Sequence, residues 1–340
     1  RLLLAESRIQ PLLLVFEDLH WVDAESQLFL NVLVDSLPTA RILLLVNHRH
    51  EYQHTWGHRT YYTQFRIDAL PEESATELLR ALLGPDPGLD PLRRLLIRRT
   101  EGNPFILEES VRALVETGAL TGERGAYRLV RAVDALQIPA TAHAIIAARI
   151  DRLSPEHKRL LQAASVIGKD VPLALLQAIV GLDEGVLGSG LRELQATEFL
   201  YETRLFPDAE YTFKHALTQE VTYGSLLQDR RRTLHASIVE AIEGLNAGRL
   251  GEQVELLAHH AVRGEAWEKA ARYLREAGTK AFLRSANTDA VGYLTKGLEV
   301  LDMLPESPSR DREELASLLT LGPALHAVKG LGAPEAERVF

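Results

Sequence analysis

Cysteine is absent from this 340-residue sequence, which excludes disulfide bridges and thiolate metal sites. Basic residues are also in deficit, because 38 Lys and Arg stand against 47 Asp and Glu and leave a net charge of -9. The chain therefore lacks the overall positive charge that direct nucleic-acid binding or an acidic membrane surface requires. No apolar run approaches the roughly 18 residues of a membrane-spanning helix, and the start has no secretory signal. These absences favour a cytoplasmic protein without membrane contact.

Two short apolar runs predict strands of a parallel sheet. Residues 12–16 and 42–46 are continuously apolar, which is the pattern of strands buried on both faces. Residues 24–37 predict a helix between them, so the three elements form a strand–helix–strand unit. Glu17 and Asp18 follow the first strand, and residues 47–49 follow the second. Ligands of open parallel sheets bind at these carboxyl ends.

Beyond residue 70 the pattern becomes helical. Four domains are expected. Residues 1–70 form a partial α/β domain and residues 71–135 a helical lid. Residues 136–225 form a winged helix of helices and a small hairpin, and residues 226–340 form tetratricopeptide-like repeats. Gly278, Ala290 and Gly297 stand where paired repeat helices pack closely. The predicted fold class is therefore multidomain, with a parallel α/β sheet followed by mostly α-helical structure.

The acidic pair Glu17 and Asp18 is the first candidate for chemistry. Two adjacent carboxylates at the end of a buried strand are costly without a partner, and a magnesium ion with a polarised water would supply one. A solvent-facing strand end is the simpler interpretation of an acidic pair alone. The residues that follow, Leu19 to Asp23, favour the functional interpretation.

Three further positions have a functional and a structural interpretation. Arg49 ends the second strand, where it could read the charge of a phosphate or simply be solvated. Gly102 and Pro104 flank one residue, and such a turn can end one helix and begin the next. His215 follows the predicted hairpin at a helix start, a place where histidines are commonly structural.

Residues 12–23, Leu-Leu-Leu-Val-Phe-Glu-Asp-Leu-His-Trp-Val-Asp, resemble the Walker B segment of signal-transduction ATPases with numerous domains, the STAND branch of the AAA+ ATPases. The resemblance implies a P-loop NTPase fold with ATP or ADP and Mg²⁺ as cofactors. It implies that Glu17 and Asp18 coordinate magnesium and support hydrolysis, although Asp is more usual than Glu at the first position. It also implies that Arg49 senses the terminal phosphate, although Asn47 and His50 replace the usual Thr and Pro.

The same resemblance implies roles for the later motifs. Gly102 and Pro104 of the Gly-x-Pro turn would lie against the adenine. His215, in the segment Tyr-Thr-Phe-Lys-His-Ala-Leu, would contact the ADP phosphates and hold the resting state. The helical repeats would bind a protein partner or ligand.

Several stretches are similar to a bacterial subgroup in which a class III adenylate or guanylate cyclase precedes the ATPase. They cover residues 148–153, 163–169, 198–202 and 215–220. The resemblance implies a cyclase or another output domain in cis. Related modules occur in transcriptional regulators, so the output stays open.

No Gly-x-x-x-x-Gly-Lys-[Ser/Thr] loop for binding phosphate is present in this sequence. Because the chain begins with Arg1 and ends without a helix stop, we expect both ends to be cut and the loop to precede residue 1. A nucleotide-independent interaction scaffold is the alternative function. Enzymatic activity of this chain alone is uncertain.

Two groups of histidines are expected to be structural. His48, His50, His54 and His58 have spacings that zinc ligands can use, but without cysteine or a His-Glu-x-x-His motif a solvated loop is the preferred interpretation. The pair at residues 259–260 is expected to pack within a helix.

Overall fold

A computed structural model describes residues 1–136, 139, 141–204 and 209–330. The chain is mostly helical, with three small sheets among the described residues. Contacts divide it into two compact units. The first contains Arg1–Ile67, Ala277–Leu298 and the segment that begins at Ser307, and the second contains Asp68–Glu276 and Glu299–Glu306.

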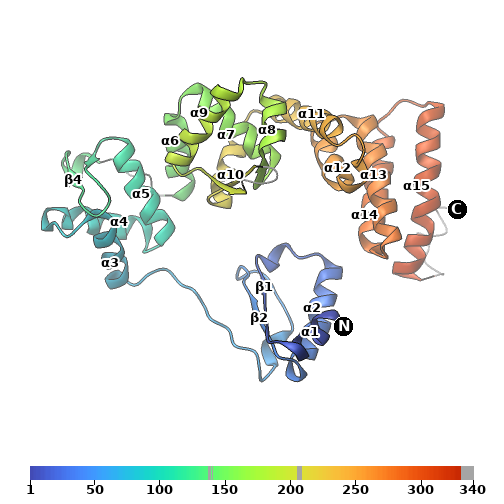
Figure 1. Ribbon diagram of the computed structural model, residues 1–340, viewed down its shortest axis with the longest axis horizontal. Coiled ribbons are helices and arrows are strands. Elements are labelled where there is room, and N and C mark those ends of the chain that lie inside the picture. The colour runs from blue at the N-terminus through green and yellow to red at the C-terminus, as the bar shows by residue number, and fades with distance from the viewer. Residues whose placement is uncertain (137–138, 140, 205–208, 331–340) are drawn as a thin grey trace. The chain divides into compact units, whose positions relative to one another are not determined.

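The first unit begins with the predicted strand–helix–strand arrangement. Strands β1 (Leu12–Phe16) and β2 (Ile42–Val46) pair in parallel with Phe16 opposite Val46. Helix α2 (Ala24–Ser36) connects them, and α1 (Leu2–Ile9) precedes them (Figure 1). Short 3-10 turns at Leu19–Trp21, Leu37–Thr39 and Trp56–His58 complete the region. Its core contains five buried residues: Leu19, Leu30, Leu33, Val34 and Trp56.

The expectation of strands buried on both faces was wrong. Side chains alternate between half-buried and exposed along both strands, and Leu13 and Leu43 are 62% and 66% exposed. One face packs on the α2 core, whereas no described element covers the other. The predicted sheet is therefore seen as one parallel pair, and a complete P-loop NTPase sheet is not present in the described part of the chain.

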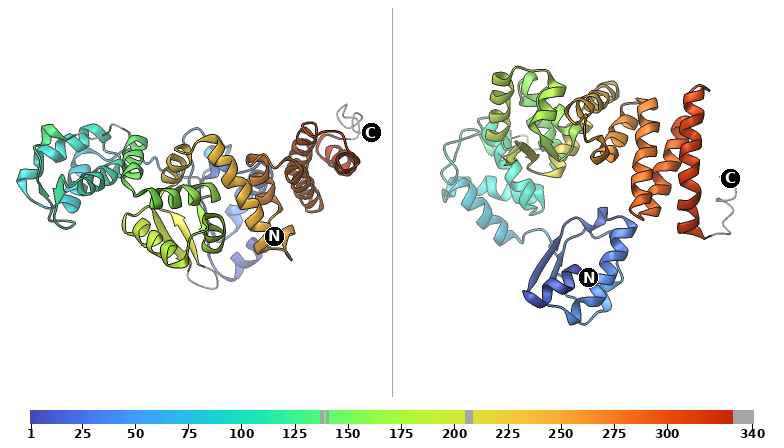
Figure 2. Two further views of the ribbon diagram at one scale, coloured as in Figure 1. Left: turned by 90° about the horizontal axis from the view of Figure 1, so that it is seen from above. Right: turned by 45° about the vertical axis from the view of Figure 1, so that its right-hand side comes forward.

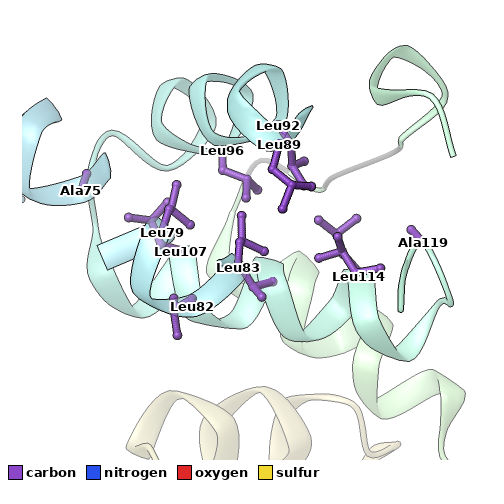
Figure 3. Close-up of a cluster of buried hydrophobic side chains, with 12 residues drawn as sticks. Ala75, Leu79, Leu82, Leu83, Leu89, Leu92, Leu96, Leu107, Leu114 and Ala119 are labelled. Atoms are coloured by element: carbon purple, nitrogen blue, oxygen red, sulfur yellow. The ribbon is translucent and has the colours of Figure 1, made fainter. Parts of the chain in front are cut away.

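The second unit begins with a three-helix group over the predicted lid. It contains α3 (Glu72–Leu83), the 3-10 turn Pro87–Leu89, α4 (Asp90–Thr100), α5 (Pro104–Glu116) and the antiparallel pair β3 (Leu120–Thr121) and β4 (Arg128–Leu129). Leucines from all three helices meet in one core, with Leu79 of α3, Leu92 of α4 and Leu107 of α5 fully buried (Figure 3). The i, i+3, i+4 spacing of these apolar residues produces the buried faces.

The next segment combines helices with a three-stranded antiparallel sheet. Its helices are α6 (Ala142–Arg152), α7 (Pro155–Ile167), α8 (Leu173–Val180), α9 (Glu184–Ala196) and α10 (Ala216–Gly224). Its strands are β5 (Asp170–Pro172), β6 (Leu200–Arg204) and β7 (Glu210–Phe213), in the order β5-β7-β6. The predicted hairpin, with strands at residues 199–201 and 211–213, is present as β6 and β7, and β5 was not predicted. The turn that the sequence predicts at residues 207–208 lies outside the described residues. Naming this segment a winged helix remains an interpretation of the sequence.

Helices form the rest of the described chain. They are α11 (Gln228–Leu245), the 3-10 turn Leu250–Glu252, α12 (Val254–Arg263), α13 (Trp267–Leu283), α14 (Asn287–Leu301) and α15 (Pro308–Lys329). A Cβ on Gly278 of α13 would lie 2.6 Å from Leu294 of α14, so these two helices approach closely, as the small residues predicted. Helix α15 lies beside α14 (Figure 2) and shares a core of Leu294, Leu321 and Leu325.

The helices were also compared with the length and hydropathy of a membrane span. In the described ranges no single helix combines the length of a membrane span with its hydropathy. Helices α8 and α9 reach them only as a pair, which is bent by 118°.

Candidate functional site

The carboxyl ends of β1 and β2 place three predicted site residues at one edge. Because the strands are parallel and in register, Glu17, Asp18 and Arg49 all follow them on the same side. Asn47 ties the two strand ends together. Its side-chain oxygen accepts the Asp18 N–H at 2.7 Å, and its carbonyl accepts the Leu19 N–H at 3.0 Å.

The backbone at this edge turns the acidic pair outward. Asp18 has a φ of 55°, in the left-handed region that aspartate tolerates better than most residues. Glu17, Asp18 and Arg49 are exposed, and none of their charged groups is paired within the described residues. Two free carboxylates at a strand end fit magnesium, which takes one or two protein carboxylates together with water and phosphate oxygens. No group of three or more metal-binding side chains occurs in the part of the chain that the structure describes.

The loop after β2 differs from the predicted solvated loop. His54 packs among aromatic rings, with Trp56 stacked at 5.0 Å and Tyr62 at 5.3 Å. The Tyr62 hydroxyl and the His54 Nε2 are 3.1 Å apart. Burial, and secondarily the charge of His48, lowers the pKa of His54. His54 is therefore a packing residue that holds the loop on the α2 core, whereas His50 is solvated, with 91% of its side chain exposed.

The Gly102–Phe105 turn has a geometry that requires its residues. Gly102 has a φ of +75°, and a Cβ there would lie 2.2 Å from the Leu70 carbonyl oxygen. The Gly102 carbonyl accepts the Leu70 N–H at 3.0 Å. Asn103 caps α5 by accepting the Ile106 N–H at 3.2 Å, and Pro104 occupies the first turn, where no donor is needed. The turn thereby fixes Phe105 at the start of α5.

His215 lies against this turn. Its ring centroid is 4.4 Å from that of Phe105, in an edge-to-face arrangement. His215 is the N-cap of α10 but makes no side-chain cap, and its Nε2 is buried without a hydrogen-bond partner among the described residues. Burial is the largest cause that lowers its pKa, with Lys214 and Arg112 adding to it and Glu109 opposing it.

The predicted site residues therefore fall into two groups. Glu17, Asp18 and Arg49 share the strand edge of the first unit, and in the second unit Phe105, directly after the Gly102–Pro104 turn, contacts His215. Sequence reasoning missed Phe105 as the side chain that joins the turn to His215. It also missed His20, both of whose ring nitrogens are buried without a partner in the described residues. Its place two residues after the acidic pair was the available signal.

No family model matches the chain. An uncharacterized protein of Rhizobium meliloti is 26% identical over 344 residues, and the chain spans about one third (33%) of its length. Among solved structures, a STAND protein with a tetratricopeptide repeat sensor from Pyrococcus horikoshii has a TM-score of 0.44 at 14% identity. That similarity covers 96% of this chain and 48% of the other.

Proposed function

We propose that this chain is part of an ATP- and ADP-dependent signal-transduction switch of the STAND type. The contact between Phe105 and His215 is the observation that carries the proposal. Two motifs far apart in the sequence, both implied by the resemblance to contact nucleotide, lie against each other. The His215 Nε2 beside them is buried and lacks a partner in the described residues. A buried polar atom without a hydrogen bond is costly, and a ligand oxygen would relieve that cost.

The residues at the strand edge have complementary roles in this proposal. Glu17 and Asp18 would hold Mg²⁺ through its water shell, and the ion would supply charge neutralisation for phosphate oxygens. Arg49, exposed and unpaired in the described region, would donate to the terminal phosphate and so distinguish ATP from ADP. Asn47 would keep these side chains in register, because it bonds the backbone of both strand ends.

The wider setting of the switch is also a proposal. The helices from α11 onward would bind a protein partner or ligand, since stacked helix pairs present extended surfaces. A class III cyclase or another output domain in cis would receive the signal. A change of nucleotide would act by shifting the population between two packings of the same chain.

The first experiment measures nucleotide binding to the longest native polypeptide that contains this chain. Fluorescent ADP and ATP would be titrated by anisotropy, with and without Mg²⁺. We expect His215→Ala to weaken ADP binding by about tenfold or more, the value of a hydrogen bond to a charged group. We expect Asp18→Asn to reduce only the Mg²⁺-dependent part. Lys158→Gln, which removes a partly exposed charge paired with Asp151, is the control. No binding by the wild-type protein at millimolar nucleotide would refute the proposal.

A nucleotide-independent scaffold is the second candidate. The observation that favours it is the close packing of α13, α14 and α15 around Gly278 and Leu294, which needs no nucleotide. Under this alternative, partner capture by the repeats would be the same with ATP, with ADP and without nucleotide. The switch proposal expects partner affinity to differ between the two nucleotides.

A further inference from the structure

One face of α5 carries an aromatic ring followed by alternating charges. Phe105, Glu109, Arg112 and Glu116 are spaced by four, three and four residues, which places them on one side of the helix. Helix α5 packs against α6 along this side (Figure 1). All four side chains have partners in the segment from α6 to α10.

Arg149 of α6 is the central partner of the two glutamates. Only 2% of its side chain is exposed, and it pairs with Glu109, which is 3% exposed, and with Glu116 at 2.6 Å. It also donates to the Thr197 carbonyl at 2.7 Å and lies 4.7 Å from the Phe199 ring centroid. Burial opposes its charge, but the hydrogen bonds and charges of Glu116 and Glu109 outweigh burial and raise the pKa of Arg149.

A second set of charges leads from α5 to His215. Arg112 pairs with Glu109 at 3.0 Å and with Glu198, and Glu198 also pairs with Lys214. Lys214 directly precedes His215, whose ring meets Phe105 at the start of the same α5 face. The ion pairs and the aromatic contact therefore form one continuous strip around His215.

The composition of this strip is that of a separable contact. A cavity of about 210 Å³ lies within it and is lined in part by Val111, Arg112 and Val115 of α5 and by Ala196, Thr197 and Glu198. Charged side chains are seldom fully buried in cores and then only in pairs, whereas contacts between domains of one chain are more polar and can separate. With the contact formed, His215 Nε2 has no access to solvent.

We propose that Phe105 and the ion pairs of Arg149, Glu109, Arg112 and Glu198 form a latch that seals His215. A ligand reaches Nε2 of His215 only when α5 separates from α6 and the Thr197–Glu198 turn. The identity of that ligand as nucleotide phosphate rests on the proposed function, whereas the sealing rests on the contacts alone. In this scheme the latched state is nucleotide-free, and ADP contacts His215 only after the latch has opened.

The test measures the distance between α3 and α9 in the full chain. Because the sequence contains no cysteine, Glu77→Cys and Arg192→Cys, both at exposed positions, give two unique spin-label sites for pulsed electron resonance. The wild type is expected to show one narrow distance population. Arg149→Gln removes one of the two cations that pair with the buried Glu109, and the closest partner of Glu116. It should favour separation by about tenfold or more, which gives a second, longer population. Faster deuterium exchange at the His215 imidazole C2 should accompany it.

Two controls keep the outcome decisive. Lys158→Gln neutralises a cation in an exposed pair and should leave the distance unchanged. If circular dichroism shows that Arg149→Gln does not fold, Arg112→Gln replaces it, because Arg112 is 20% exposed and its loss leaves the Arg149–Glu109 pair intact. A folded Arg149 or Arg112 variant with the wild-type distance and the wild-type His215 exchange would overturn the latch. If these variants open but nucleotide neither binds nor changes the distance, the latch stands and the proposed function fails.

Discussion

Acidification is expected to open the pair of helices α11 and α12, because two histidines are buried between them. His235 and His260 are 2% and 1% exposed, and their Nδ1 atoms are 2.8 Å apart. One ring must therefore donate and the other accept, so the accepting ring must be neutral and both rings cannot be protonated together. The Tyr223 hydroxyl is 3.1 Å from the second nitrogen of His235.

The magnitude follows from the difference between folded and unfolded proton binding. Burial, with nearby positive charges, lowers the pKa of His235 to about 4 and that of His260 to about 3. Both histidines titrate at 6.5 when unfolded, so between pH 6.5 and about 4 the unfolded state binds more protons and stability falls as the pH falls. From pH 7 to pH 5 each histidine removes about 2 kcal/mol, and the two together about 4 kcal/mol.

Hydrogen–deuterium exchange with mass spectrometry measures this effect locally. Peptides from α11 and α12 are compared between pH 7 and pH 5 after correction for the intrinsic exchange rate. Peptides from α3 and α4 are the internal control, because residues 71–100 contain no histidine and α5, which contacts His215, is left out. We expect the free energy of opening of α11 and α12 to drop by several kcal/mol relative to the control. An equal change in both regions would refute the reasoning about the histidine pair.

Three substitutions, each with a matched control, test the packing, with urea unfolding as the measurement. Gly102→Ala combines a φ of +75° with a backbone clash at 2.2 Å and should lower the free energy of unfolding by about 2–4 kcal/mol. Its control Gly118→Ala, with a φ of +66° and open space, should lower it by about 1 kcal/mol. Equal losses of stability would contradict the clash. Leu79→Ala, at a fully buried position, should lower the free energy of unfolding by about 2–5 kcal/mol. Its control Val130→Ala, at a position 62% exposed, should change it by less than about 0.5 kcal/mol. A small loss of stability at Leu79 would contradict the core assignment. Gly278→Ala places a methyl group against Leu294 and should destabilise the protein by about 1 kcal/mol, because overpacking exceeds the gain in helix propensity. Its control Gly292→Ala, with open space, should stabilise the protein by up to about 1 kcal/mol. Stabilisation by both substitutions would show that α13 and α14 are not in close contact.

Local sequence patterns determined the elements of this protein. The apolar runs at residues 12–16 and 42–46 predicted the two strands, since five consecutive apolar residues favour extended structure. Asn103 before Pro104 and Ser154 before Pro155 are local patterns typical of helix starts, and both caps are present. These signals are local, because propensity and capping depend on residues a few positions apart. They also predicted Glu17, Asp18 and Arg49 at one sheet edge, because parallel strands place their carboxyl ends together.

The tertiary structure decided which distant residues meet. With 38 basic and 47 acidic residues, no spacing rule could assign Arg149 to Glu109 and Glu116, and nothing local distinguished Phe105 from the other apolar residues of α5. The burial of His235 against His260, and the exposure of Leu13 and Leu43, likewise depend on which faces the packing covers. An amphipathic pattern states that a face will be buried, but the partner of that face is chosen by packing and charge over the whole unit. For this reason the sequence predicted the elements and the edge of the candidate site, and the structure alone brought His215 and Phe105 together under the ion pairs.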